Sequence, residues 1–234
     1  DLVLASGKHL ETYLGQLRDA LPSEIEVIEV GRPIPSLRIG AGDELFVCCP
    51  AHSVGGIDPH WWHSVDNMQR ATRVVADTLG EVDPAGRAAY QQRARAYQRQ
   101  LDELDGWIRS QLSRIPRGDR KLVTAHLAFG YFCDEYGFEA LPIQGLTRER
   151  QATAQYLAAS IDALRDERIK AVFPETQANP NVLEQLVAET GVRLGDPLIA
   201  DGAGTGTAAS YAGMMRHNVN TIVAALAPRR ETGE

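Results

Sequence analysis

The sequence is poor in cysteine and contains no long apolar run. Its three cysteines are too few for a disulfide-stapled scaffold, and no CxxC pair is present, which excludes the usual cysteine zinc site. Cys48 and Cys49 are adjacent at the end of a strand-like run, where we expect two packed thiols and not a strained vicinal disulfide. Cys133 lies in a helical pattern that favours the core. No stretch of about 18 apolar residues occurs, so the sequence offers no membrane span.

Basic residues are also in the minority. The 234 residues include 24 Lys and Arg against 31 Asp and Glu, which gives a formal net charge of -7. This balance argues against nucleic acid and anionic membrane surfaces as partners, because both select clustered positive charge. What is present is an ordinary globular composition, 44% hydrophobic and 24% charged, in a chain long enough to bury a core.

A signal peptide and an initial Met are missing too. The chain starts at Asp1, directly on the strand-like run "DLVLAS". We therefore expect a mature or cut chain, whose contact with a membrane runs only through a partner protein or a lost lipid anchor.

The first third of the chain alternates between strand and helix patterns. Leu10, Leu14, Leu17 and Leu21 recur at helical spacing, which predicts an amphipathic helix. The segment 65–82 also has helical periodicity. Strand patterns are found at residues 1–6, 24–30 and 43–49.

The longest helical pattern follows. Asp83 can serve as its N-cap with Pro84 at the first helical position. Apolar residues then recur every three or four positions up to Pro116, with polar residues on the other faces. This pattern predicts a helix of about 45 Å, a rigid strut between two lobes. The predicted division is an N-terminal lobe at 1–83, a linker helix at 84–115 and a C-terminal lobe at 116–234.

The second half of the chain repeats a strand–helix unit four times. Such repetition is typical of a parallel sheet with helices on its faces, so we predict an α/β fold. In these sheets, ligands bind beyond the carboxyl ends of the strands. The predicted strands are 121–126, 139–145, 169–176 and 193–201.

Ionisable side chains stand at three of these strand ends. They are His126, Glu175 and Asp201, while the remaining strand runs into Gln144. His60 lies in a loop of the other lobe, so a cleft between the lobes would bring imidazoles and carboxylates together. Two histidine nitrogens and a carboxylate oxygen suit zinc, manganese or iron. Each residue alone also fits a structural role, as a satisfied polar group at a strand end or as a turn residue.

Four further histidines are weaker candidates. His52 and His63 flank the His60 motif, His9 lies at a strand-to-helix turn, and His217 fits a solvated or lobe-packing position. No Ser or Cys has the surroundings of an activated nucleophile, and "GAGTGT" lacks the spacing and the lysine of a nucleotide loop. In the motif "GGIDPHWWHSVDN", we expect the two tryptophans to pack behind His60 and to hold its ring.

Four segments together carry a family resemblance. "DPHWW" before a helix, "KLVTAHLAFGYFCDEYGFEALPIQG", "IKAVFPETQANP" and "YAGMMRHNVNTIVAAL" resemble, in this order, the zinc/manganese-type solute-binding receptors of ABC transporters. The resemblance runs from about residue 2 to 227. It implies two α/β lobes joined by one long rigid helix, a Zn²⁺ or Mn²⁺ ion (Fe²⁺ is possible) held between them, and delivery of that ion to a membrane permease.

The resemblance also assigns residues. His60 is the histidine of the DPHxW motif, His126 stands where manganese-selective members often have Glu, and Asp201 matches the ligating aspartate. Glu175 matches a glutamate that lines the region without ligating. A segment with a further histidine, in an HxYEP-like motif, is absent ahead of "DLVLASGKHLE", so the N-terminal lobe is expected to be incomplete. The chain is then either a fragment or one ligand short. A long His-rich loop is missing as well, which favours the broader zinc/manganese type.

The sequence therefore predicts a monomeric, extracytoplasmic metal receptor without catalytic activity, which the linker helix restrains from wide opening. Two alternatives are a zinc hydrolase with Glu175 as general base and a metal-free adhesion or interaction module.

Overall fold

The computed structural model describes residues 1–38, 56–142, 160–162, 164–176 and 181–228. The predicted strand 43–49, with Cys48 and Cys49, and His52 and Gln144 lie outside these residues.

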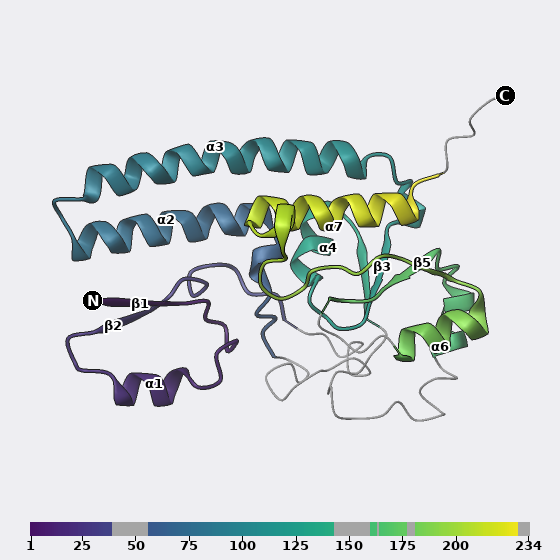
Figure 1. Ribbon diagram of the computed structural model, residues 1–234, viewed down its shortest axis with the longest axis horizontal. Coiled ribbons are helices and arrows are strands. Elements are labelled where there is room, and N and C mark those ends of the chain that lie inside the picture. Colours follow the sequence, from purple (N-terminus) through teal and green to yellow (C-terminus); the bar gives the residue numbers. More distant parts are fainter. Residues whose placement is uncertain (39–55, 143–159, 163, 177–180, 229–234) are drawn as a thin grey trace.

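The N-terminal lobe is built on two parallel strands. The strand β1 (Leu2–Ala5) pairs with β2 (Glu26–Glu29), and the helix α1 (Leu14–Ala20) connects them (Figure 1). The predicted helix begins at Leu14 and not at Leu10, and Lys8 and His9 ahead of it have positive φ angles outside the helical region.

Two long helices form a layer above both lobes. The helix α2 (Val65–Val82) has the predicted bounds, and α3 (Arg87–Leu112) runs antiparallel to it (Figure 1). The prediction that α3 begins at Pro84 is wrong. Residues 84–86 form a turn instead, in which the Asp83 carboxylate accepts hydrogen bonds from the Gly86 N–H and the Tyr90 hydroxyl.

The helix α3 spans from above the N-terminal strands to above the C-terminal sheet (Figure 1). Its C-terminal half is buried through Leu101, Leu104, Ile108 and Leu112, and there it contacts α7 (Tyr211–Leu226). The expected strut is therefore present as a helix, while the division at 83 and 115 stays a prediction.

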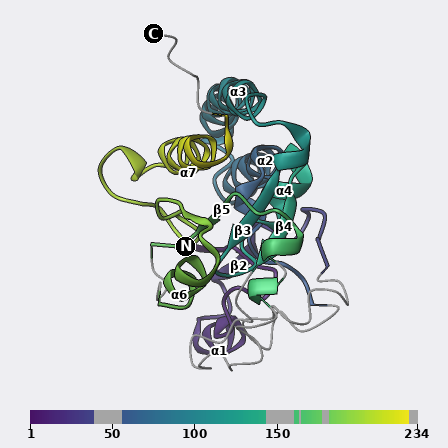
Figure 2. The ribbon, with the colours of Figure 1, turned by 90° about the vertical axis from the view of Figure 1, so that its right-hand side faces the viewer.

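The C-terminal lobe contains a fully parallel sheet, as predicted. Its strands follow the order β4-β3-β5-β6. The helices α3, α4 and α7 lie on one side of it and α6 (Asn181–Thr190) on the other (Figure 2). The bounds are β3 Lys121–Thr124, α4 Gly130–Tyr136, β4 Glu139–Pro142, β5 Ala171–Phe173 and β6 Arg193–Leu194.

Strand alternation divides the core between the two faces of this sheet. Leu122 and Phe173 belong to the cluster under α3, α4 and α7, whereas Val123 and Val172 pack with Leu183 of α6. Neighbouring side chains of each strand thus point to opposite faces, as expected for strands that are covered on both faces. Cys133 lies in the first cluster with a raised thiol pKa due to burial, as expected for a core residue.

The chain order fixes where a ligand can lie. From β3 the chain passes to β4 on one side, and then crosses to β5 on the other side of β3. The carboxyl ends of β3 and β5 thus form the switch point at which open α/β sheets leave a crevice. Among the described residues we find no helix with the length and hydropathy of a membrane span.

Candidate metal centre

His60 is held at the end of a loop by its own motif. It is the N-cap of a short 3-10 helix, η3 (Trp61–His63), and is 2% exposed. The Asp58 carboxylate accepts the His60 backbone N–H at 2.8 Å and lies 2.8 Å from Nδ1 of the ring. An Asp that bonds the backbone two residues on forms a local turn. A neutral ring that donates its Nδ1–H to this carboxylate keeps the Nε2 lone pair for a metal.

His126 has the same arrangement on the other lobe. It follows β3, and its backbone N–H donates to Oε1 of Glu175 at 2.9 Å. Its Nδ1 contacts Oε2 of the same carboxylate. Glu175, beyond the end of β5, is 6% exposed. Glu175 therefore orients the His126 ring across the switch point, whereas its sequence position alone was compatible with a turn cap or a general base.

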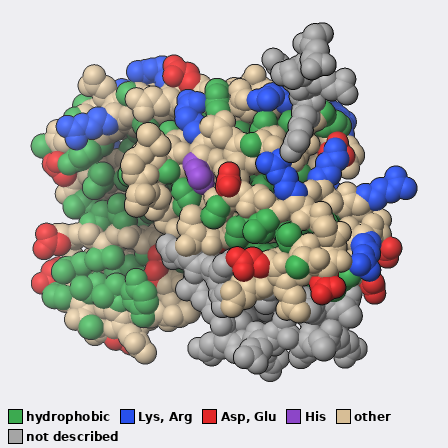
Figure 3. Space-filling view, turned by 45° about the vertical axis from the view of Figure 1, so that its right-hand side comes forward, with side chains coloured by type: hydrophobic (Ala, Val, Ile, Leu, Met, Phe, Trp, Pro, Cys, Tyr) green, Lys and Arg blue, Asp and Glu red, His purple; other side chains and the backbone are tan. Residues whose placement is uncertain are grey.

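Asp201 is the third predicted ligand. It follows the segment 198–200, in which Leu198 forms an isolated parallel β-bridge with Glu175. The Asp201 side chain is 37% exposed. One carboxylate oxygen lies 3.6 Å from Nε2 of His60, and the other lies 3.9 Å from Nε2 of His126. A histidine side chain lies beside an acidic one near the centre of the face shown in Figure 3.

The three predicted ligands meet in one place. One ligand atom each from His60, His126 and Asp201 can be chosen so that all lie within 4.8 Å of one another. The two imidazole rings lie 5.2 Å apart between centroids. Ligand atoms around a tetrahedral zinc ion with bonds of 2.0–2.1 Å are about 3.4 Å apart. The cluster is therefore close to the geometry of a bound ion.

The two tryptophans take different directions from η3. The ring of Trp62 makes an edge contact with His60 at 5.3 Å between centroids, as expected for a residue that holds the imidazole. Trp61 instead packs against Val30 and Ile34, and its indole N–H donates to Oγ of Ser6 at 3.0 Å. Trp61 therefore anchors η3 to the N-terminal lobe, and Trp62 provides the ring contact with His60.

His63 is fully buried and is no ligand of this cluster. Its Nε2 donates to the carbonyl of Ala200 at 2.8 Å, and its ring contacts Phe129. Burial, with the nearby His60, lowers its pKa to about 3. Among the described residues no donor reaches its Nδ1, which costs about 1–3 kcal/mol for a buried polar atom.

The remaining histidines lie outside the cluster. His9 is exposed, and His217 donates from Nε2 to the carbonyl of Pro197 at 2.9 Å. His52 is not among the described residues. The sequence analysis missed the partner role of Asp58, although its position two residues before His60 was the available signal.

Comparison with known proteins relates almost the whole chain to one family. Residues 1–225 match ZnuA, described as "Zinc-uptake complex component A periplasmic". The zinc-binding protein TroA of Treponema pallidum is 35% identical over 97% of this chain and 73% of its own length. The manganese-binding lipoprotein MntA of Bacillus subtilis is 33% identical over 97% and 73%. The iron-binding protein YfeA of Yersinia pestis is 29% identical over 95% and 69%.

The fold agrees with this relationship. The solved structure of the periplasmic TroA superposes with a TM-score of 0.83 at 32% identity, and covers 97% of this chain and 81% of that one. The two α/β lobes with parallel sheets are therefore those of the TroA type. The chain belongs to the ZnuA family of metal-binding, solute-binding proteins.

Proposed function

We propose that this chain is an extracytoplasmic receptor that binds Zn²⁺ or Mn²⁺ between its lobes and delivers the ion to the permease of an ABC transporter. The ligands are Nε2 of His60, Nε2 of His126 and the carboxylate of Asp201. The observation that carries the proposal is the convergence of these three groups, from distant parts of the chain, to within 4.8 Å.

Charge and hydrogen bonding support a divalent cation as the cargo. Three carboxylates, those of Asp58, Glu175 and Asp201, surround two imidazoles, so a charge of +2 compensates a strongly negative site. Nδ1 of each histidine lies against a carboxylate that can accept its N–H, the usual outer-shell arrangement of a ligating imidazole. Mixed nitrogen and oxygen ligands accept zinc, manganese and iron, and the relatives are named for all three.

The geometry favours a receptor over the zinc hydrolase. A general base on a metal-bound water needs a carboxylate oxygen directed at that water. Both oxygens of Glu175 instead face nitrogens of His126. A metal-free adhesion module would not need ligands gathered in this way, so the cluster counts against it too. Members of the family are receptors and not enzymes, and we extend this to the present chain.

Calorimetric titration with Zn²⁺, Mn²⁺ and Fe²⁺ tests the proposal, on wild type and on His126→Ala. His217→Ala is the matched control, because this histidine lies outside the cluster. We expect one ion per chain, tightest for zinc according to the general order of metal affinities, strong weakening in His126→Ala and no change in His217→Ala. Equal affinity and equal thermal stabilisation by metal in all three proteins would refute the assigned site.

A further inference from the structure

The carbonyl of Ala200 receives two side-chain donors from η3. The indole N–H of Trp62 donates to it at 3.1 Å, and Nε2 of His63 donates at 2.8 Å. The donors lie two and three residues after His60 in the chain, and the acceptor directly precedes Asp201. We call these two hydrogen bonds to the Ala200 carbonyl the bridge. It lies next to two of the three proposed metal ligands, His60 and Asp201.

The bridge completes the support of the segment that ends in Asp201. The side chain of Asn218 on α7 accepts from the Ile199 N–H and donates to the Ile199 carbonyl, both at 2.9 Å. Leu198 is hydrogen-bonded to Pro174 and Thr176. Residues 198 and 199 are thus fixed by the sheet and by α7, and residue 200 is fixed by η3.

Among the described residues, none makes a hydrogen bond to Gly202 or Ala203, which follow Asp201. The chain bends at once, and Gly202 has a φ of +73°, a conformation that L side chains rarely adopt. A glycine-rich loop does not hold a carboxylate in place. The position of Asp201 relative to His60 therefore depends on the contacts that precede it.

The chemistry of His63 fits positioning better than stabilisation. Its hydrogen bond to Ala200 is offset by the buried Nδ1 that no described donor reaches. An apolar side chain of similar size would remove this buried acceptor, and the Ala200 carbonyl would still accept from Trp62. The fold alone thus gains little from a histidine at this place.

We propose that Trp62 and His63 are positioning residues of the metal site, whose hydrogen bonds to the Ala200 carbonyl hold the Asp201 carboxylate at the distance from His60 that a bound ion needs. The inference rests on the proposed function, since it assumes that these ligands hold the metal. The bridge also ties the N-terminal loop to the C-terminal lobe. Contacts that hold the ligands in place without the help of the ion lower the cost of binding.

The test compares His63→Leu, which removes the donor, with His63→Gln, whose amide nitrogen can replace Nε2. Zn²⁺ affinity is measured by competition with a chromophoric chelator, Co²⁺ absorption reports the coordination geometry, and thermal unfolding of the metal-free proteins reports stability. Leu226→Ala is the control for simple destabilisation, because Leu226 is buried in the same core at the far end of α7. Trp62→Phe removes the second donor and keeps an aromatic ring against His60.

We expect His63→Leu to bind Zn²⁺ about tenfold more weakly, with an altered Co²⁺ spectrum and no loss of metal-free stability. His63→Gln should restore affinity and spectrum, Trp62→Phe should weaken binding, and Leu226→Ala should lose stability alone. Wild-type affinity in His63→Leu would overturn the inference while leaving the proposed function intact. Equal weakening in the Leu and Gln variants would also overturn it. Failure of the wild type to bind any metal would overturn the proposed function and the inference with it.

Discussion

Replacing Glu175 by Gln is the most informative single change at this site. The carboxylate offers one oxygen to the His126 backbone N–H and the other to Nδ1 of the same residue. Gln keeps the shape but has one oxygen and one NH₂ group, so it can accept only one of these two donors. The other contact must break or reverse.

Both outcomes weaken metal binding. If the amide oxygen faces the ring, the NH₂ group opposes the backbone N–H and a charge-assisted hydrogen bond of about 1.5–3 kcal/mol is lost. If the NH₂ group faces the ring, Nδ1 must accept, and the proton moves to Nε2, which then cannot coordinate. We expect Zn²⁺ affinity to fall by about 10–100-fold, the usual effect of an outer-shell partner, or about 1.4–2.7 kcal/mol.

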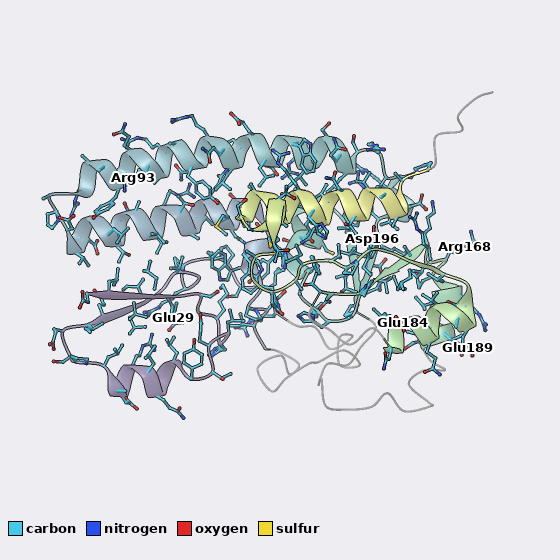
Figure 4. All side chains as sticks on the ribbon, viewed as in Figure 1. Glu29, Arg93, Arg168, Glu184, Glu189 and Asp196 are labelled. Carbon is cyan, nitrogen blue, oxygen red and sulfur yellow. The ribbon has the colours of Figure 1, made fainter. Side chains whose placement is uncertain are left out.

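Chelator competition at neutral pH measures this loss directly. Glu189→Gln makes the same chemical change on the exposed face of α6, away from the strand ends (Figure 4), and should leave affinity unchanged. Unchanged affinity in Glu175→Gln would show that the carboxylate does not orient His126. Ester hydrolysis by the zinc-loaded wild type that Glu175→Gln abolishes would instead support the hydrolase alternative.

Three further predictions concern the surroundings of the site. A Cβ at Gly130 would lie 2.6 Å from the Asp58 carboxylate, so Gly130→Ala should displace the partner of His60 and weaken Zn²⁺ binding up to about tenfold; unaltered affinity would contradict this. The pKa of His63 is lowered from 6.5, its ordinary value, to about 3 in the folded protein. Between these pH values the imidazole is protonated in the unfolded chain but neutral in the folded protein, so stability is lost as the pH falls from 6.5 toward 3. Urea unfolding at pH 7 and 4.5 should show a loss about 2–3 kcal/mol larger in wild type than in His63→Leu, and equal losses would refute it. Leu104→Ala should cost about 2–5 kcal/mol of unfolding free energy without a change in metal affinity, since Leu104 is 1% exposed in the core under α3.

The repeated pattern of the second half was enough to predict the parallel sheet. The order of strands and helices along the chain was sufficient to expect His126 and Asp201 at one edge of the sheet. The predicted strand 193–201 was too long, because β6 ends at Leu194 and Asp201 reaches the edge through a separate bridge between Leu198 and Glu175. The helix α2 was also predicted with its observed bounds from its helical periodicity, and in the structure the Ser64 side chain caps its N-terminus by accepting from the Asn67 N–H. Local and tertiary preferences coincide in these segments.

The start of α3 shows where local signals mislead. Asp83-Pro84 is a good helix start by propensity, yet the chain needs a turn of three residues to reverse direction between two antiparallel helices. The Asp83 carboxylate still accepts from a backbone N–H, but that of Gly86 in the turn. The chain reversal between two packed helices depends on tertiary contacts, and intrinsic helix propensity carries no information about them.

The residues that hold the predicted ligands in place, Asp58, His63 and Glu175, were the least predictable part of the site. Nothing in the sequence distinguishes His63, which donates to a backbone carbonyl 137 positions away, from a solvent-exposed histidine or a ligand. Glu175 and His126 are 49 positions apart, and only their common edge of the sheet hinted at contact. Asp58 could have been found from its spacing to His60, whereas burial and long-range partners require the fold.

The central claim is that His60, His126 and Asp201 hold the metal. Crystallography of the zinc-loaded protein with anomalous diffraction at the zinc edge tests it most directly. We predict one anomalous peak, about 2.0–2.2 Å from Nε2 of both histidines and from a carboxylate oxygen of Asp201. A peak at another place, or a zinc ion that leaves any of the three unligated, would contradict the assignment.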